Sequence, residues 1–142
     1  MTDLYLSLGS NLGDRHALLL KAIDRLAHRV GRLVRCSSFI ETEPWGYTSE
    51  HRFLNAVALF LTDLTPREVL TATQDIEQEL GRTKKRESSS PEASYSDRPI
   101  DIDILLYGDA HIEEPDLQIP HPLMQERDFV MRPLRELQEL LQ

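Results

Sequence analysis

Two aspartates stand two residues apart in an otherwise apolar stretch of this chain. Residues 98–107 read Arg-Pro-Ile-Asp-Ile-Asp-Ile-Leu-Leu-Tyr, and this β-branched, alternating pattern predicts a strand. Because successive strand side chains point to opposite faces, Asp101 and Asp103 would share one face, and Ile102 and Ile104 the other. Two carboxylates about 7 Å apart at their Cα atoms repel each other unless a cation lies beside them. A hard ion such as Mg²⁺ fits such oxygen ligands.

The alternative is that both aspartates belong to the solvated face of an edge strand, as charged strand residues usually do. A second charged feature is a basic cluster, in which Arg82, Lys84, Lys85 and Arg86 fall within five residues, with Arg98 a short distance beyond. On a chain with a formal net charge of −8, such a cluster suggests a local anion site. The alternative there is a solvated charged loop.

Length and composition limit the class of protein. The 142 residues predict one domain, residues 1–142, with a sizeable core. The single cysteine, Cys36, excludes an intramolecular disulfide and a multi-cysteine metal site. No apolar run approaches the ~20 residues of a membrane span, and the first residues do not resemble a signal peptide. We therefore expect a cytoplasmic protein, monomeric by default, that acts on small molecules and binds neither nucleic acid nor membranes.

The N-terminal half predicts three strands and a helix. Alternating leucines predict a strand over residues 4–8, and an apolar stripe predicts a helix that stops at Gly31. Further strands are expected over residues 33–42 and 53–61. In the last of these, Asn55 is an amide among apolar neighbours, so it must bond either backbone groups or the edge of a heterocyclic ligand.

The next helix carries clear start and stop signals. Thr65 and Glu68 predict a capping box around a proline at the first helical position, and Gly81 ends the helix. Gln74 and Glu77 share a face of this helix and have the spacing of ordinary exposed polar residues.

The segment between the basic cluster and the aspartates has little apolar content. Residues 87–96 are rich in serine and predict either a lid that closes over phosphates or a flexible linker. Beyond Tyr107, residues 111–121 are turn-rich, and a closing helix is expected after Pro133.

The order strand, helix, strand, strand, helix, strand predicts an α+β fold, namely a ferredoxin-like βαββαβ sandwich with additional C-terminal helices. Paired carboxylates, a basic cluster and a lid together suggest phosphoryl or nucleotidyl chemistry. Two other functions stay open. One is a regulatory module that binds a small ligand without turnover, and the other is a metal-dependent nucleotidyl transferase that releases pyrophosphate.

Residues 98–105 resemble the signature of the hydroxymethyl-dihydropterin pyrophosphokinase family. The similarity extends over nearly the whole chain, through Gly9-Ser10-Asn11-Leu12, Ser37-Ser38-Phe39, Phe53-Leu54-Asn55-Ala56, Pro120-His121-Pro122 and Arg127-Asp128-Phe129. The resemblance implies a step of folate biosynthesis, in which a pyrophosphoryl group passes from ATP to 6-hydroxymethyl-7,8-dihydropterin. Two Mg²⁺ ions would assist, and AMP would be the other product.

The resemblance also implies three sets of site residues. The metal ligands would be Asp101 and Asp103, which together with Arg82, Lys84 and Arg98 would form the catalytic group. The pterin would contact Thr42, Pro44, Trp45, Gly46, Phe53, Asn55, Asp101 and Phe129. The ATP would contact Gln74, Glu77, Arg82, Lys84, Tyr95, Arg98, Ile104, Leu117, His121 and Arg127.

Overall fold

The computed structural model describes residues 1–44, 50–81 and 99–141. The elements follow in the order β1 (Thr2–Ser10), α1 (Arg15–Arg29), β2 (Gly31–Cys36), β3 (Ile40–Thr42), β4 (Phe53–Thr62), α2 (Pro66–Glu79), β5 (Asp101–Tyr107), β6 (Ile112–Glu114), β7 (Leu117–Ile119), the 3₁₀ turn η2 (Met124–Glu126) and α3 (Asp128–Leu140). The predicted α+β class is confirmed. In the described part of the chain, no helix has the length and apolar character to cross a membrane.

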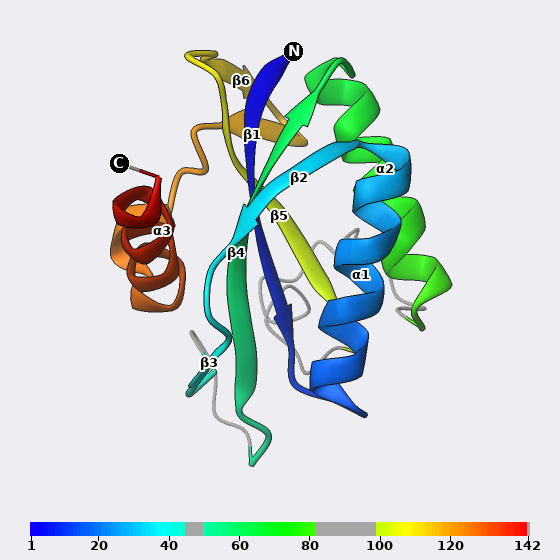
Figure 1. Cartoon of the computed structure of the whole chain (residues 1–142), viewed down its shortest axis with the longest axis vertical. Coiled ribbons are helices and arrows are strands. Elements are labelled where there is room, and N and C mark those ends of the chain that lie inside the picture. The colour runs from blue at the N-terminus through cyan, green and yellow to red at the C-terminus, as the bar shows by residue number, and fades with distance from the viewer. Residues whose placement is uncertain (45–49, 82–98, 142) are drawn as a thin grey trace.

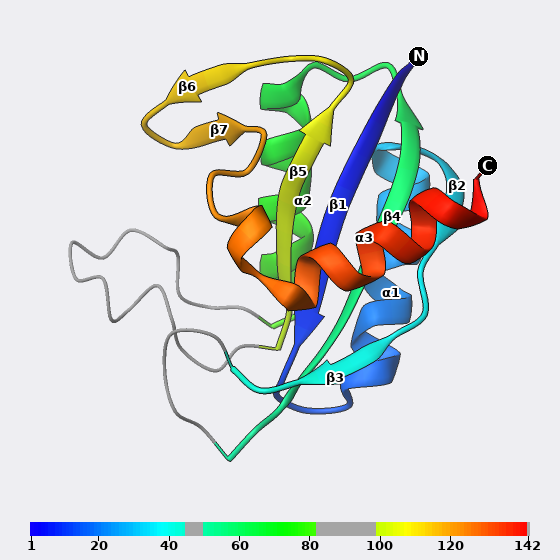
Figure 2. The same ribbon diagram turned by 90° about the vertical axis from the view of Figure 1, so that its left-hand side faces the viewer.

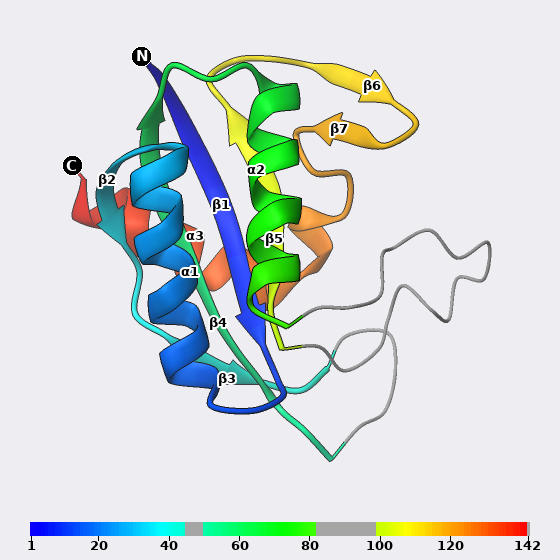
Figure 3. The same cartoon turned by 90° about the vertical axis from the view of Figure 1, so that its right-hand side faces the viewer.

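One antiparallel sheet organises the molecule. Its strands lie in the order β2-β4-β1-β5, and β3 pairs with the part of β4 beyond β2. The helices α1 and α2 cover one face of the sheet (Figures 1 and 3), whereas α3 crosses the opposite face (Figure 2). The chain thus has the expected βαββαβ order, with β3 as an added short strand and β6–β7 as a separate hairpin.

The two faces of β4 divide the core as its alternation predicted. Ala58 and Phe60 belong to the buried cluster under α1 and α2. Val57 and Leu59 belong to a second cluster, which also contains the apolar residues of α3. Both faces of β4 are therefore buried over most of its length, and its buried polar residues, Asn55 and Thr62, lie toward its two ends.

The predicted continuous strand over residues 33–42 is wrong, because the ladder is interrupted at Ser37. The Ser37 N–H donates to the Val57 carbonyl at 2.9 Å, but the Val57 N–H donates to the Ser37 hydroxyl, at 3.0 Å, in place of a backbone carbonyl. The next amide, of Ser38, donates to the Glu136 carboxylate of α3 at 2.6 Å. Side chains therefore replace ladder bonds here, and pairing resumes only at Ile40.

The helix signals are confirmed in part. Thr65 and Glu68 form the capping box, with the Thr65 N–H donating to the Glu68 carboxylate at 2.9 Å. Gly81 follows α2 with a φ of +106°, as a helix-ending glycine should. Gly31, however, is the first residue of β2 rather than a left-handed stop, and a Cβ there would collide with the Leu61 carbonyl oxygen.

In the C-terminal part, one region has more regular structure than expected, and the predicted start of the closing helix is wrong. The turn-rich region contains the hairpin β6–β7, which Arg67 of α2 holds by ion pairs with Glu114 and Asp116. The helix α3 begins at Asp128 and includes Pro133, which the sequence placed before its start. A proline removes one helical hydrogen bond. The buried face of α3, which includes Pro133 itself, offsets that loss by packing on the sheet.

Candidate active site

Asp101 and Asp103 lie on the sheet face that α3 covers further along. Both side chains are partly exposed, whereas Ile102 and Ile104 are 5% and 6% exposed and lie in the cluster beneath the other helices. The predicted alternation of β5 is therefore confirmed. Leu105, on the same face as the aspartates, is buried in the α3 cluster, so the pair stands just beyond the covered part of the sheet.

Gly9 of β1 forms the centre of this uncovered part. It pairs with Asn55 of β4 on one side and with Asp101 of β5 on the other. A Cβ at Gly9 would lie 2.9 Å from the Asn55 Oδ1 and 3.4 Å from the ring of Phe53. The glycine thus leaves room for these two side chains. This role of Gly9 was not predicted, although the residue leaves a gap without a side chain on the face of β1 opposite its leucines.

Asn55 is the buried polar group that the sequence singled out. It is 2% exposed, and its Nδ2 donates to the Thr42 hydroxyl of β3 at 2.6 Å. Phe53 and Thr42 are paired directly across β4 and β3 and are partly exposed. The structure therefore brings Thr42, Phe53 and Asn55 together on the face that carries the aspartates. Pro44 follows Thr42 closely and is also partly exposed.

The start of α3 brings an aromatic ring and a cation to the same face. The Arg127 guanidinium carbon lies 5.6 Å from the centre of the Phe129 ring, within the range of a cation–π contact. Phe129 packs against the cluster under α3 and is partly exposed.

The other described residues of the predicted ATP set gather around the edge strand β5. Gln74 is an exposed residue of α2, while Ile104 and Leu117 are buried in one core cluster with side chains of α2. The His121 N–H donates to the Leu105 carbonyl at 3.0 Å, which fixes the segment after β7 beside β5. These residues come from four separate parts of the chain, and the fold brings them to one edge of the sheet.

Glu77 differs from the ordinary exposed residue that its spacing predicted. It is 8% exposed, and its Oε2 accepts a hydrogen bond of 2.8 Å from the backbone N–H of Ile102. Ile102 stands between the two aspartates, so Glu77 connects α2 to the strand segment that carries them. A signal was present in the sequence, because Glu77 lies one turn after the buried Thr73 and beside the buried Ile76.

Replacement of Glu77 by alanine is expected to destabilise the protein by about 1–3 kcal/mol, because the Ile102 N–H then loses its acceptor in a buried place. Glu77→Gln keeps an oxygen acceptor and is expected to lose less. Urea unfolding measures both, with Gln78→Ala on the exposed side of α2 as the control. Equal midpoints for Glu77→Ala and Gln78→Ala would contradict this role.

Several predicted site residues lie outside the described residues. They are Trp45, Gly46, Arg82, Lys84, Tyr95 and Arg98, and with them the rest of the basic cluster and the predicted lid. Described site residues flank both segments in the chain. Thr42 and Phe53 lie before and after residues 45–49, and Glu77 and Asp101 lie before and after residues 82–98.

The aspartate pair fits the way in which proteins bind Mg²⁺. Among the described residues, no three histidine, cysteine, aspartate or glutamate side chains gather into a metal-binding group. Mg²⁺ is usually bound by one or two carboxylates, with waters and substrate phosphates completing its shell. Two partly exposed carboxylates on one strand face match that requirement.

The fold and the placement of these residues define an α+β protein with a polar site at the open end of an antiparallel sheet. The model of the family named 7,8-dihydro-6-hydroxymethylpterin-pyrophosphokinase (HPPK) matches residues 5–139. The chain therefore belongs to the HPPK family.

Relatives with known names agree. The 2-amino-4-hydroxy-6-hydroxymethyldihydropteridine pyrophosphokinase of Porphyromonas gingivalis is 54% identical over 138 residues, which cover 96% of this chain and 91% of the relative. The protein of the same name in Bacillus subtilis is 42% identical over 134 residues, covering 94% of this chain and 76% of the relative.

Solved structures support the fold. A crystal structure of HPPK-DHPS in complex with substrates matches with a TM-score of 0.70 and 14% identity. A triple mutant of Plasmodium falciparum HPPK-DHPS matches with a TM-score of 0.71 and 18% identity. In both cases the match covers 95% of this chain but 40% of the larger chain, so this protein corresponds in fold to one part of those chains.

Proposed function

We propose that this protein transfers a pyrophosphoryl group from ATP to the hydroxymethyl oxygen of 6-hydroxymethyl-7,8-dihydropterin. The products would be AMP and the pterin diphosphate, with one proton released. The observation that supports the proposal is the row Asn55–Gly9–Asp101, in which a buried amide on β4 and a partly exposed carboxylate on β5 flank the same glycine of β1, in a chain of the HPPK family. We also propose that residues 1–142 act as one domain.

The pterin end of the site would be formed by Thr42, Pro44, Phe53, Asn55 and Phe129. Flat rings bind between aromatic side chains in offset or tilted arrangements, and Phe53 and Phe129 are two partly exposed rings on this face. The Asn55 amide offers both a donor and an acceptor, which suits the mixed edge of a pterin. Trp45 and Gly46 would complete this end.

The nucleotide end would lie along β5, next to Gln74, Glu77, Ile104, Leu117, His121 and Arg127. Arg82, Lys84, Tyr95 and Arg98 would bind the phosphates or cover them. The two ends meet at the aspartates, so the pterin hydroxyl and the β-phosphorus of ATP would be neighbours there. Holding two reactants in this way converts a bimolecular reaction into an effectively unimolecular one.

In the reaction, the pterin hydroxyl oxygen forms a bond to the β-phosphorus, and the bond from that phosphorus to the oxygen shared with the α-phosphate breaks. The proton of the hydroxyl is released, and AMP departs with the shared oxygen. Two Mg²⁺ ions held by Asp101 and Asp103 would neutralise the phosphate charge and polarise the phosphorus–oxygen bonds. The chain itself supplies position, through β5 for the carboxylates and β4 for the pterin.

The products separate this function from its alternatives. Incubation with ATP, Mg²⁺ and hydroxymethyl-dihydropterin, followed by phosphorus NMR, is expected to show AMP and a pterin diphosphate. Free pyrophosphate without AMP would indicate a nucleotidyl transferase, and binding without any product would indicate a regulatory module. Either outcome would overturn the proposal.

The proposed function also indicates which partners we expect. Both substrates are small molecules, and a net charge of −8 disfavours nucleic acid. We propose a monomer that acts in the cytoplasm, which sedimentation and fractionation would test.

A further inference from the structure

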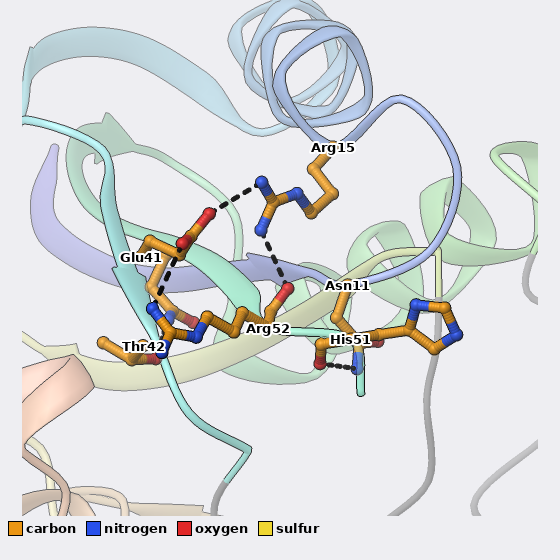
Figure 4. A network of polar contacts seen from close by, with 7 residues as sticks. Asn11, Arg15, Glu41, Thr42, His51 and Arg52 are labelled. Carbon is orange, nitrogen blue, oxygen red and sulfur yellow. Dashed lines mark hydrogen bonds and ion pairs between the residues drawn. The ribbon is translucent and has the colours of Figure 1, made fainter. Parts of the chain in front are cut away.

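Arg15 joins three elements behind the proposed pterin site. It is the first residue of α1, and its Nη2 donates to the Glu41 carboxylate at 2.8 Å while its Nη1 donates to the Arg52 carbonyl at 2.9 Å (Figure 4). Glu41 lies in β3, and Arg52 directly precedes β4. One guanidinium therefore ties the start of α1 to the end of β3 and to the start of β4.

The two residues that Arg15 binds are chain neighbours of pterin-site residues. Glu41 precedes Thr42, Arg52 precedes Phe53, and Thr42 and Phe53 are paired across the two strands. Because strand side chains alternate, Glu41 points toward the α1 face, whereas Thr42 and Phe53 point to the opposite face. The rigid, planar fork of a guanidinium suits two acceptors at a fixed separation. Arg15 is thus placed to hold β3 and β4 from the face opposite the proposed pterin site.

Further contacts strengthen the same connection. The Arg52 guanidinium lies 3.5 Å from the Glu41 carboxylate, and the Asn11 amide donates to the His51 carbonyl at 3.0 Å (Figure 4). The hydrogen bond from Arg15 is the largest cause of a lowered pKa at the Glu41 carboxyl. The residues border an open depression of about 490 Å³.

We infer that Arg15 is a positioning residue that holds Thr42 and Phe53 at the separation required for pterin binding. Its side chain is 32% exposed and that of Glu41 44%, and exposed ion pairs contribute little to stability. The contact would therefore act mainly on the placement of the strand ends. Since this role rests on the proposed function, the experiment must be able to separate the two.

Arg15→Ala is expected to raise the KM for hydroxymethyl-dihydropterin about tenfold, with kcat and the KM for ATP within about twofold. Arg15→Lys should recover only part of the loss, because an ammonium group does not reproduce the fork. The matched control is Arg29→Ala, at the other end of α1, where the guanidinium binds Glu79 of α2 at 2.5 and 2.6 Å. It should leave both KM values unchanged.

Titration with 6-hydroxymethylpterin in the absence of nucleotide gives a second measure, and the affinity is expected to fall by the same factor in Arg15→Ala. Glu41→Ala removes the link from its other side and should weaken pterin binding in the same direction. If either variant binds pterin as Arg29→Ala does, or if kcat and both KM values change together, the inference is wrong. A wild-type protein that forms no AMP would instead overturn the proposed function.

Discussion

Asp101→Asn and Asp103→Asn are each expected to lower the rate of AMP formation by at least about 10³-fold, equivalent to about 4 kcal/mol of transition-state stabilisation. Asparagine keeps the shape of the side chain and one oxygen, but it removes the charge that holds a divalent cation. Both side chains are partly exposed on the strand face, so neither change disturbs the core.

Stability should not follow activity in these variants. Two like charges on neighbouring positions of one face repel each other, and the removal of one relieves this repulsion. The unfolding midpoint is therefore expected to change much less than turnover does. Asp109→Asn, an exposed position in the turn after β5, is the matched control and should keep full activity.

Chelation gives an independent check of the same site. Excess EDTA is expected to stop AMP formation by the wild-type protein, and added Mg²⁺ should restore it. Turnover that persists in both asparagine variants, or in EDTA, would contradict the role assigned to the carboxylates.

The alternation of β4 and β5 was predictable because each strand lies between two packed layers. In β5, apolar side chains had to face α1 and α2, which left Asp101 and Asp103 together on the opposite face. The Thr65 cap was predictable for a similar reason, since its partners lie within four residues of one another. Local periodicity and local hydrogen bonds are the features that a sequence displays directly.

The missed features depend on partners that are distant in the chain. The break at Ser37 is accompanied by a bond from Ser38 to Glu136, 98 residues later, and the burial of Glu77 depends on the Ile102 amide 25 residues away. Similarly, Pro133 lies inside α3 because the sheet buries that face of the helix. The importance of Gly9 appears only when β1 is placed between β4 and β5.

Replacement of Asn55 by leucine should have the second largest effect, a fall of about 100-fold in kcat/KM for the pterin, or about 2.7 kcal/mol. A leucine of similar size presents no donor or acceptor, so the polar edge of the pterin would lose its partners on being buried. Binding of ATP, which lies along β5 in the proposed arrangement, should not change.

The hydrogen bond from Asn55 to Thr42 makes it possible to separate recognition from orientation. Thr42→Val removes the hydroxyl that receives the Asn55 Nδ2 but keeps the amide itself. Its expected effect is therefore smaller, a fall of about tenfold in kcat/KM, because the Asn55 amide loses the hydrogen bond that orients it but keeps its own donor and acceptor.

The stability of Asn55→Leu provides a further test. Asn55 is 2% exposed among the apolar residues of β4, so leucine should be tolerated by the fold, and activity and stability should separate. If Asn55→Leu retained the wild-type KM for the pterin, Asn55 would be a structural amide, and the pterin would have to bind elsewhere.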